Sequence, residues 1–105
     1  MQVVNLRNNG ALPFLPDDHT IEVSATVGAD GVKALPIDPL PDDLAGLISH
    51  VAGYERLALD AAVNGGRDRV VRALLAHPLV AQYDRAEKLT DLLLAANAQH
   101  LAWAR

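Results

Sequence analysis

Histidines and paired carboxylates are the residues of this sequence that could most directly bind a metal ion or move a proton. The four histidines are His19, His50, His77 and His100. None lies three or four residues from another, which is the spacing that places two metal ligands on one helix face. Surface or helix-end positions are therefore favoured over a metal site, and long-range assembly of some of them stays open.

Two pairs of adjacent aspartates, at residues 17–18 and 42–43, raise the question of acid–base catalysis. Adjacent side chains diverge on a turn or in the first turn of a helix, and carboxylates are common in both places for structural reasons. No acid and base can be assigned separate environments here. Turn formation and helix stabilisation are the favoured roles.

Three arginines close together could form a small cationic patch for a phosphate group. They are Arg67, Arg69 and Arg72, with Asp68 among them, and this mixture favours a solvated helix surface. The Asn-Gly-Gly run at 64–66 lacks the preceding strand and the glycine pattern of a phosphate-binding loop, so it predicts a helix end. Neither of the two serines lies in a Gly-x-Ser-x-Gly elbow. These patterns identify no catalytic, cofactor-binding or metal-binding residue.

The triplet Asn8-Asn9-Gly10 is the remaining candidate for a functional loop. Its residue types tolerate positive φ angles and suit a tight turn. A structural turn is the favoured role, and a small-molecule site that uses this loop and nearby carboxylates is the weaker alternative.

Composition narrows the classes of protein to which the chain can belong. It has 105 residues, of which 50% are hydrophobic and 21% charged, with a net charge of -4 and no cysteine. This predicts a single domain over residues 1–105 without disulfides. No clustered positive footprint for nucleic acid is present, and no apolar stretch approaches the ~20 residues of a membrane span. Without a signal-peptide pattern at its start, the chain is expected to be cytoplasmic.

Apolar periodicity and turn residues predict an α+β fold with a small antiparallel sheet followed by helices. Residues 3–6 form a short predicted strand, and 21–35 form a hairpin around Ala29-Asp30-Gly31. Prolines and acidic residues near Pro41 predict a helix start. The predicted helices cover 41–64, 68–76 and 84–102.

Each predicted helix carries an apolar stripe that is expected to face the core. On the last helix, Asp84 is the expected N-cap. The stripe residues are Leu44, Leu47, Ile48, Val51, Ala58 and Ala62 on the first helix, Val70, Val71, Leu74 and Leu75 on the second, and Leu89, Leu92, Leu93 and Ala96 on the third.

Several segments, taken in order, resemble the C-terminal part of the family 4 glycoside hydrolases, which include 6-phospho-β-glucosidases and 6-phospho-α-glucosidases. The likeness spans nearly the whole chain, and it departs from the family where Phe14 replaces a usual asparagine and where Arg7 and Ser24 replace common prolines. The segments are 3–18 (VVNLRNNGALPFLPDD), 21–23 (IEV), 31–35 (GVKAL), 39–41 (PLP), 54–57 (YERL), 61–63 (AAV) and 73–80 (ALLAHPLV).

The resemblance implies a larger enzyme, in which a Rossmann domain binds NAD and precedes a C-terminal domain similar to that of lactate and malate dehydrogenases. Such enzymes cleave glycosides by a redox route, an exception to the two-carboxylate mechanism, with NAD oxidising the sugar and a divalent metal such as Mn2+ stabilising an enolate. The family's cofactor fingerprint, metal ligands and catalytic base lie upstream of the matching stretch. The resemblance assigns no catalytic residue to this chain. Asn8, Asn9 and Gly10 match the corresponding loop of the family and are the residues considered further.

Two functions are therefore expected. The first is a C-terminal fragment of an NAD- and Mn2+-dependent 6-phospho-glycosidase, inactive alone, whose partner is the missing N-terminal Rossmann half. The second is a standalone interaction module that self-associates, with Trp103 and the leucine-rich last helix as contributors.

Overall fold

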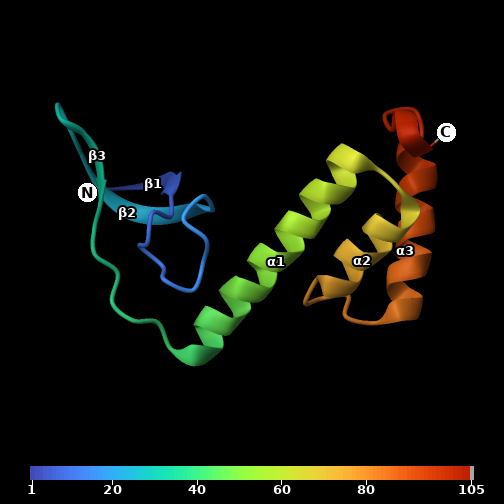
Figure 1. Ribbon diagram of the computed structural model, residues 1–105, viewed down its shortest axis with the longest axis horizontal. Helices are drawn as coiled ribbons and strands as arrows, with labels where there is room; N and C mark the ends of the chain where they lie inside the picture. Colours follow the sequence, from blue (N-terminus) through green and yellow to red (C-terminus); the bar gives the residue numbers. More distant parts are fainter. Residues whose placement is uncertain (105) are drawn as a thin grey trace. The chain divides into compact units, whose positions relative to one another are not determined.

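A three-stranded antiparallel sheet forms the amino-terminal part of the chain (Figure 1). The computed structural model describes residues 1–104. Its strands are β1 (Gln2–Arg7), β2 (Thr20–Gly28) and β3 (Gly31–Ala34), with β2 in the centre. The predicted strand 3–6 and hairpin 21–35 are confirmed. Gly28 pairs with Gly31 at the hairpin end, where Gly31 has a φ of 104° that favours glycine.

One face of this sheet is buried along the first half of β2. Because side chains alternate along a strand, Ile21, Val23 and Ala25 share that face, and all three are buried. The pairing of β1 with β2 sets Leu6 opposite Ile21. The loop between β1 and β2 adds two further buried leucines to this core, Leu12 and Leu15.

The carboxyl-terminal part is helical. Its elements are α1 (Asp42–Asn64), α2 (Arg67–Ala76), α3 (Tyr83–Asn97) and the short 3-10 helix η1 (Ala102–Ala104). Chain contacts divide the protein into two compact units, Met1–Ala45 and Gly46–Arg105, and the first turn of α1 belongs to the first of them. The α+β class is confirmed. Within residues 1–104, no helix has the length and apolarity to cross a membrane.

The last helix is shorter than the prediction of 84–102. It ends at Asn97, and the chain then tightens into i→i+3 hydrogen bonds, with the amide of His100 donating to the carbonyl of Asn97 at 2.8 Å. This bend lets the chain return so that Trp103 lies directly over Gly65. The predicted N-cap is also wrong, because Gln82 occupies that position and Asp84 lies within the first turn.

The predicted apolar stripes identify only one of the buried helical side chains, Val71 on α2. On α3, Ala86 and Thr90 are buried while Leu92 is 69% exposed. Most of the buried helical side chains are small, whereas several stripe leucines remain exposed. α2 and α3 pack against each other, and small side chains allow a close approach there. The other buried helical side chains are Ala52, Ala61, Val71 and Ala73, and the exposed stripe leucines are Leu44, Leu47, Leu75 and Leu93.

A substitution at Gly65 tests the contact between this residue and Trp103. A Cβ atom there would lie 2.5 Å from Cγ of Trp103, and the φ of Gly65 is 69°. We expect Gly65→Ala to lower the free energy of unfolding by more than about 1 kcal/mol, since both the clash and the positive φ oppose alanine. Urea titration would measure the loss, and the emission of the single tryptophan should shift as its ring is displaced.

Gly53→Ala is the matched control, because a Cβ atom at Gly53 meets nothing within 4 Å and the residue lies inside α1. This change should stabilise the chain by about 0.5–1 kcal/mol through helix propensity. Equal effects of the two substitutions would contradict the importance of the Trp103 contact.

Candidate functional site

The loop after β1 is organised by a single buried amide. Only 2% of Asn8 is exposed. Its Nδ2 donates to the carbonyls of Leu12 and Leu15, both at 2.9 Å, and to that of Pro16 at 3.2 Å, while its Oδ1 accepts from the amide of Leu12 at 2.7 Å. The amide NH2 and carbonyl are thus both used within the loop. The side chain of Asn8 is committed to holding the loop closed.

The two residues that follow Asn8 make the turn that their types predicted. Asn9 has a φ of 42° and Gly10 a φ of 85°, the region that Asn and Gly tolerate. The backbone amide of Asn8 donates to the carbonyl of His19 at 2.7 Å, and that of Asn9 donates to Asp17 at 3.0 Å. The Asp17–Asp18 pair accordingly lies in the closing turn of this loop.

An open hollow of about 720 Å³ lies beside this loop, within the first unit. Leu6, Val32 and Ile37 give it apolar walls. Arg7 and Asn9 supply the polar groups at its lining. Such a hollow can accept an apolar surface with a polar or anionic margin, and it is where two of the predicted loop residues, Asn9 and Gly10, meet solvent.

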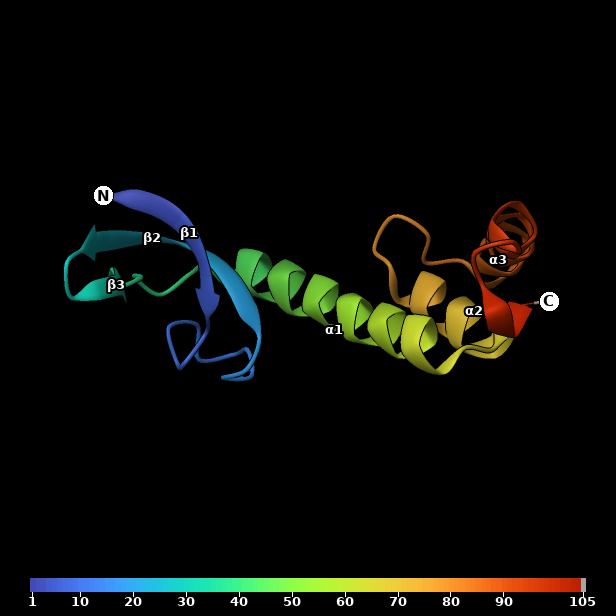
Figure 2. The ribbon, with the colours of Figure 1, turned by 90° about the horizontal axis from the view of Figure 1, so that it is seen from above.

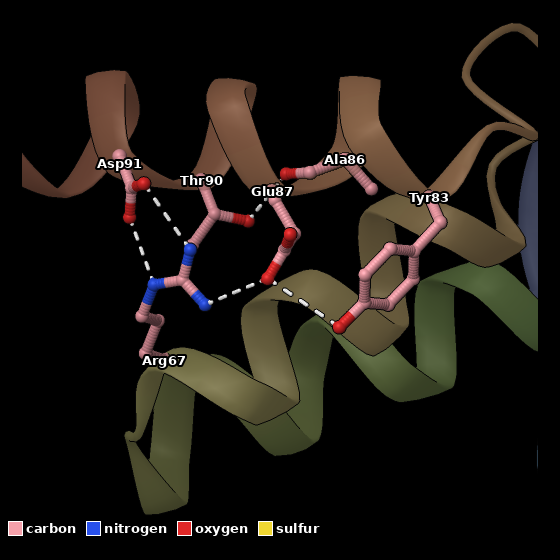
Figure 3. A network of polar contacts seen from close by, with 6 residues as sticks. All are labelled: Arg67, Tyr83, Ala86, Glu87, Thr90 and Asp91. Atoms are coloured by element: carbon pink, nitrogen blue, oxygen red, sulfur yellow. Dashed lines mark hydrogen bonds and ion pairs between the residues drawn. The ribbon is translucent and has the colours of Figure 1, made fainter.

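The arginine cluster is used to join helices. Arg67 donates two hydrogen bonds to the carboxylate of Asp91, from Nε at 2.8 Å and Nη2 at 3.1 Å, and a third to Glu87 at 3.4 Å (Figure 3). The hydroxyl of Tyr83 donates to the same Glu87 oxygen at 3.4 Å. The hydrogen bonds to Asp91 and Glu87 raise the pKa of Arg67, and the bond from Arg67 holds the pKa of the Asp91 carboxyl below its ordinary value. Arg67 therefore connects α2 to α3.

Arg69 likewise forms an ion pair and a hydrogen bond, in its case where α2 follows α1. Its Nε lies 3.2 Å from Oδ2 of Asp60, and its Nη1 donates to the carbonyl of Gly65 at 2.9 Å. Two of the three guanidinium groups considered for a phosphate site are thus paired with carboxylates. The arrangement favours a structural role over a phosphate site.

The four histidines do not come together. His77 ends α2, its Nδ1 accepts from the amide of Leu79 at 3.1 Å, and its ring meets Tyr54 edge to face at 4.6 Å. His50 is exposed on α1, and Nε2 of His100 lies 3.0 Å from Nε2 of Gln99. Within residues 1–104, no three His, Asp or Glu side chains form a group that could hold a metal ion.

The helical unit contains a second hollow that the sequence patterns missed. It measures about 350 Å³ and its lining includes Tyr54, Ala61, Leu74, Leu94 and Trp103. The signal that could have revealed it is Gly65, because a side chain at this position would clash with Trp103, which lies over the helix junction.

Comparison with known proteins identifies the family. The model of the family 4 glycosyl hydrolase C-terminal domain matches residues 1–80. The chain belongs to this family. A probable 6-phospho-beta-glucosidase of Bacillus subtilis is 34% identical to this family 4 chain over 101 residues, which cover 96% of the chain and 23% of that relative.

Solved structures agree with this assignment. A 6-phospho-alpha-glucosidase from gut microorganisms, in complex with NAD and glucose-6-phosphate, is 29% identical and superposes with a TM-score of 0.84 over 95% of the family 4 chain and 23% of its own. A second such enzyme, in complex with NAD and Mn2+, shares the fold with a TM-score of 0.83 over 91% of this chain and 22% of its own, at 22% identity. The chain thus spans about a quarter of the length of the relatives it matches.

The residues present do not fit the two cofactors held by those solved structures. The sequence has no cysteine and no Gly-x-Gly-x-x-Gly run to receive a dinucleotide. The described part of the chain assembles no metal-ligand cluster. No chemical step is therefore assigned to this chain's own residues through NAD or Mn2+.

The buried amide of Asn8 yields a direct test. Asn8→Asp keeps the size of the side chain but presents a carboxylate to three carbonyl oxygens. We expect the free energy of unfolding to fall by about 2–3 kcal/mol, the cost of leaving buried polar groups unpaired. Urea titration would measure it. Asn9→Asp is the control: Asn9 is exposed and its positive φ suits aspartate, so a comparable loss there would contradict the role of Asn8.

The pair between Arg67 and Asp91 yields a pH-dependent prediction. Because the pKa of Asp91 is lowered in the folded chain, the pair stabilises the fold above the unfolded carboxyl pKa, and this contribution is lost as pH falls through the folded pKa. Asp91→Asn should therefore lower the Tm slightly at neutral pH and have a vanishing effect in acid. A double-mutant cycle with Arg67→Gln, followed by thermal melts, should give coupling that shrinks in about 1 M NaCl. Coupling that is unchanged by acid and salt would contradict the ion pair.

Proposed function

We propose that this chain is the C-terminal structural part of an NAD- and Mn2+-dependent 6-phospho-glycosidase and that it has no turnover alone. The coverage of the comparisons carries the proposal: nearly all of the chain aligns, yet it accounts for only 23% of the Bacillus subtilis relative. The cofactor and metal sites are assigned to the remaining length of such an enzyme. This chain's residues bind and position that remainder and supply no proton or electron.

The hollow beside Asn9 is the surface that we assign to this contact. Its volume is about 720 Å³, and Leu6, Val32 and Ile37 are among the residues that line it. An apolar surface of this kind becomes buried when a partner covers it. The hydrogen bonds of the Asn8 side chain hold the loop in place, so that Asn9 and Arg7 stay at the margin of the hollow.

A standalone interaction module is the second candidate function. It is favoured by large apolar side chains that remain exposed on the helices, among them Leu59 at 65% and Val63 at 71%. Under this proposal the surfaces that would have met the rest of an enzyme mediate self-association instead.

Activity measurements test the first proposal. The purified chain, supplied with nitrophenyl 6-phosphoglucosides, NAD and Mn2+, should release no nitrophenol, while a full-length relative should do so under the same conditions. Neither NAD nor Mn2+ at millimolar concentration should raise the Tm of the chain alone. Robust turnover by the 105-residue chain would disprove the proposal. A Rossmann-domain reading frame in the DNA upstream of Met1 would separate it from the standalone module.

A further inference from the structure

Two pairs of asparagine followed by glycine occur in this chain, at Asn9-Gly10 and at Asn64-Gly65. Such a pair favours loss of the side-chain amide, because glycine has no Cβ to hinder the approach of its backbone nitrogen to the asparagine side chain. Both asparagines are exposed. Sequence and exposure therefore do not distinguish the two sites, whereas their hydrogen bonds do.

At Asn64 the structure holds both reacting groups, the side-chain amide of the asparagine and the backbone amide of the glycine. The side-chain Nδ2 donates to Oδ1 of Asp60 at 2.7 Å, and the amide of Gly65 donates to the carbonyl of Ala61 at 2.9 Å. Trp103 also lies over Gly65. A nitrogen that is bonded into the end of a helix can react only after that end opens.

At Asn9 neither of the two groups is held. The residue lies in the loop between β1 and β2, and this loop extends beyond the ends of the two strands (Figure 2). Within residues 1–104, no hydrogen bond engages the Asn9 side chain or the backbone amide of Gly10. A Cβ atom at Gly10 would meet nothing within 4 Å, so the space around this glycine is open.

We propose that Asn9 is a deamidation site of this chain and that the structure protects Asn64 from the same reaction. The backbone nitrogen of Gly10 attacks Cγ of Asn9, so that an N–C bond forms and the bond from Cγ to Nδ2 breaks. The proton of the Gly10 amide leaves with Nδ2 as ammonia. Water then opens the resulting succinimide ring at either carbonyl and gives aspartate or isoaspartate. Water is the only co-reactant, and no group is oxidised or reduced.

The product changes the hollow beside Asn9. Among the described residues that line this hollow, Arg7 is the only charged one. A carboxylate at residue 9 is ionised at neutral pH, so the reaction adds a negative charge to a margin that was cationic. The reaction uses only the loop and water, and its test is therefore independent of the proposed contact with a larger enzyme.

Incubation of the purified chain in a mildly alkaline buffer tests the assignment, because loss of the glycine amide proton promotes the reaction. Trypsin releases residues 8–33 and 57–67 as separate peptides, and fragmentation in a mass spectrometer assigns the change to Asn9 or Asn8 in the first of them. After subtraction of a zero-time sample, the rate at Asn9 should exceed the rate at Asn64 by roughly tenfold or more, since Asn64 must first open locally.

The unfolded chain and one variant separate structure from sequence. In guanidinium chloride the rates at Asn9 and Asn64 should converge, because the same Asn-Gly pair is then free at both positions. Asp60→Ala removes the acceptor of Nδ2 of Asn64, and it should speed the reaction at Asn64 while leaving the rate at Asn9 unchanged. Equal rates at the two sites of the folded chain would overturn the proposal, as would the same ratio of rates in the folded and the unfolded chain.

Discussion

A polar side chain without access to water must find its hydrogen bonds inside the protein, and two such residues shape the two units of this chain. Asn8 is 2% exposed and Thr90 is fully buried. Asn8 closes the loop over the sheet, and the hydroxyl of Thr90 donates to the carbonyl of Ala86 at 2.7 Å along α3. Within the described residues, no buried side-chain nitrogen or oxygen lacks a partner. The bonds of Asn8 fix the geometry of its loop, and the bond of Thr90 within α3 allows its hydroxyl to be buried.

The groups that suggest chemistry in the sequence are largely used to hold the structure together. Arg67 reaches from α2 to two carboxylates of α3, and Arg69 pairs with Asp60 of α1. The side-chain NH2 group of Asn8 donates hydrogen bonds to three carbonyls of its own loop. The hollow beside Asn9 remains accessible on the surface. This distribution supports our proposal that the chain, a small part of a larger family 4 enzyme, packs against the rest of that enzyme.

Much of the fold could be predicted from local sequence. The hairpin followed from alternation in β2 and from turn residues, and α1 begins one residue after Pro41, whose carbonyl accepts from the amide of Ala45 at 3.0 Å. The positive φ angles of Asn9 and Gly10 followed from residue type. The family could also be recognised from the sequence, because several short segments between residues 3 and 80 occur in the order that is typical of the family. None of these features requires knowledge of which helices touch.

Tertiary structure alone decided which side chains are buried and where the last helix ends. Periodicity shows which residues share a helix face, but it cannot show how closely a neighbouring helix approaches, and close approach buries Ala86 and Thr90 while leaving Leu92 exposed. α3 ends at Asn97, and the chain beyond it brings Trp103 over Gly65, a residue 38 positions earlier. The sequence by itself thus determined the elements, the turns and the family. Contacts between distant residues determined the core and the hollows, because burial depends on separations that no local pattern encodes.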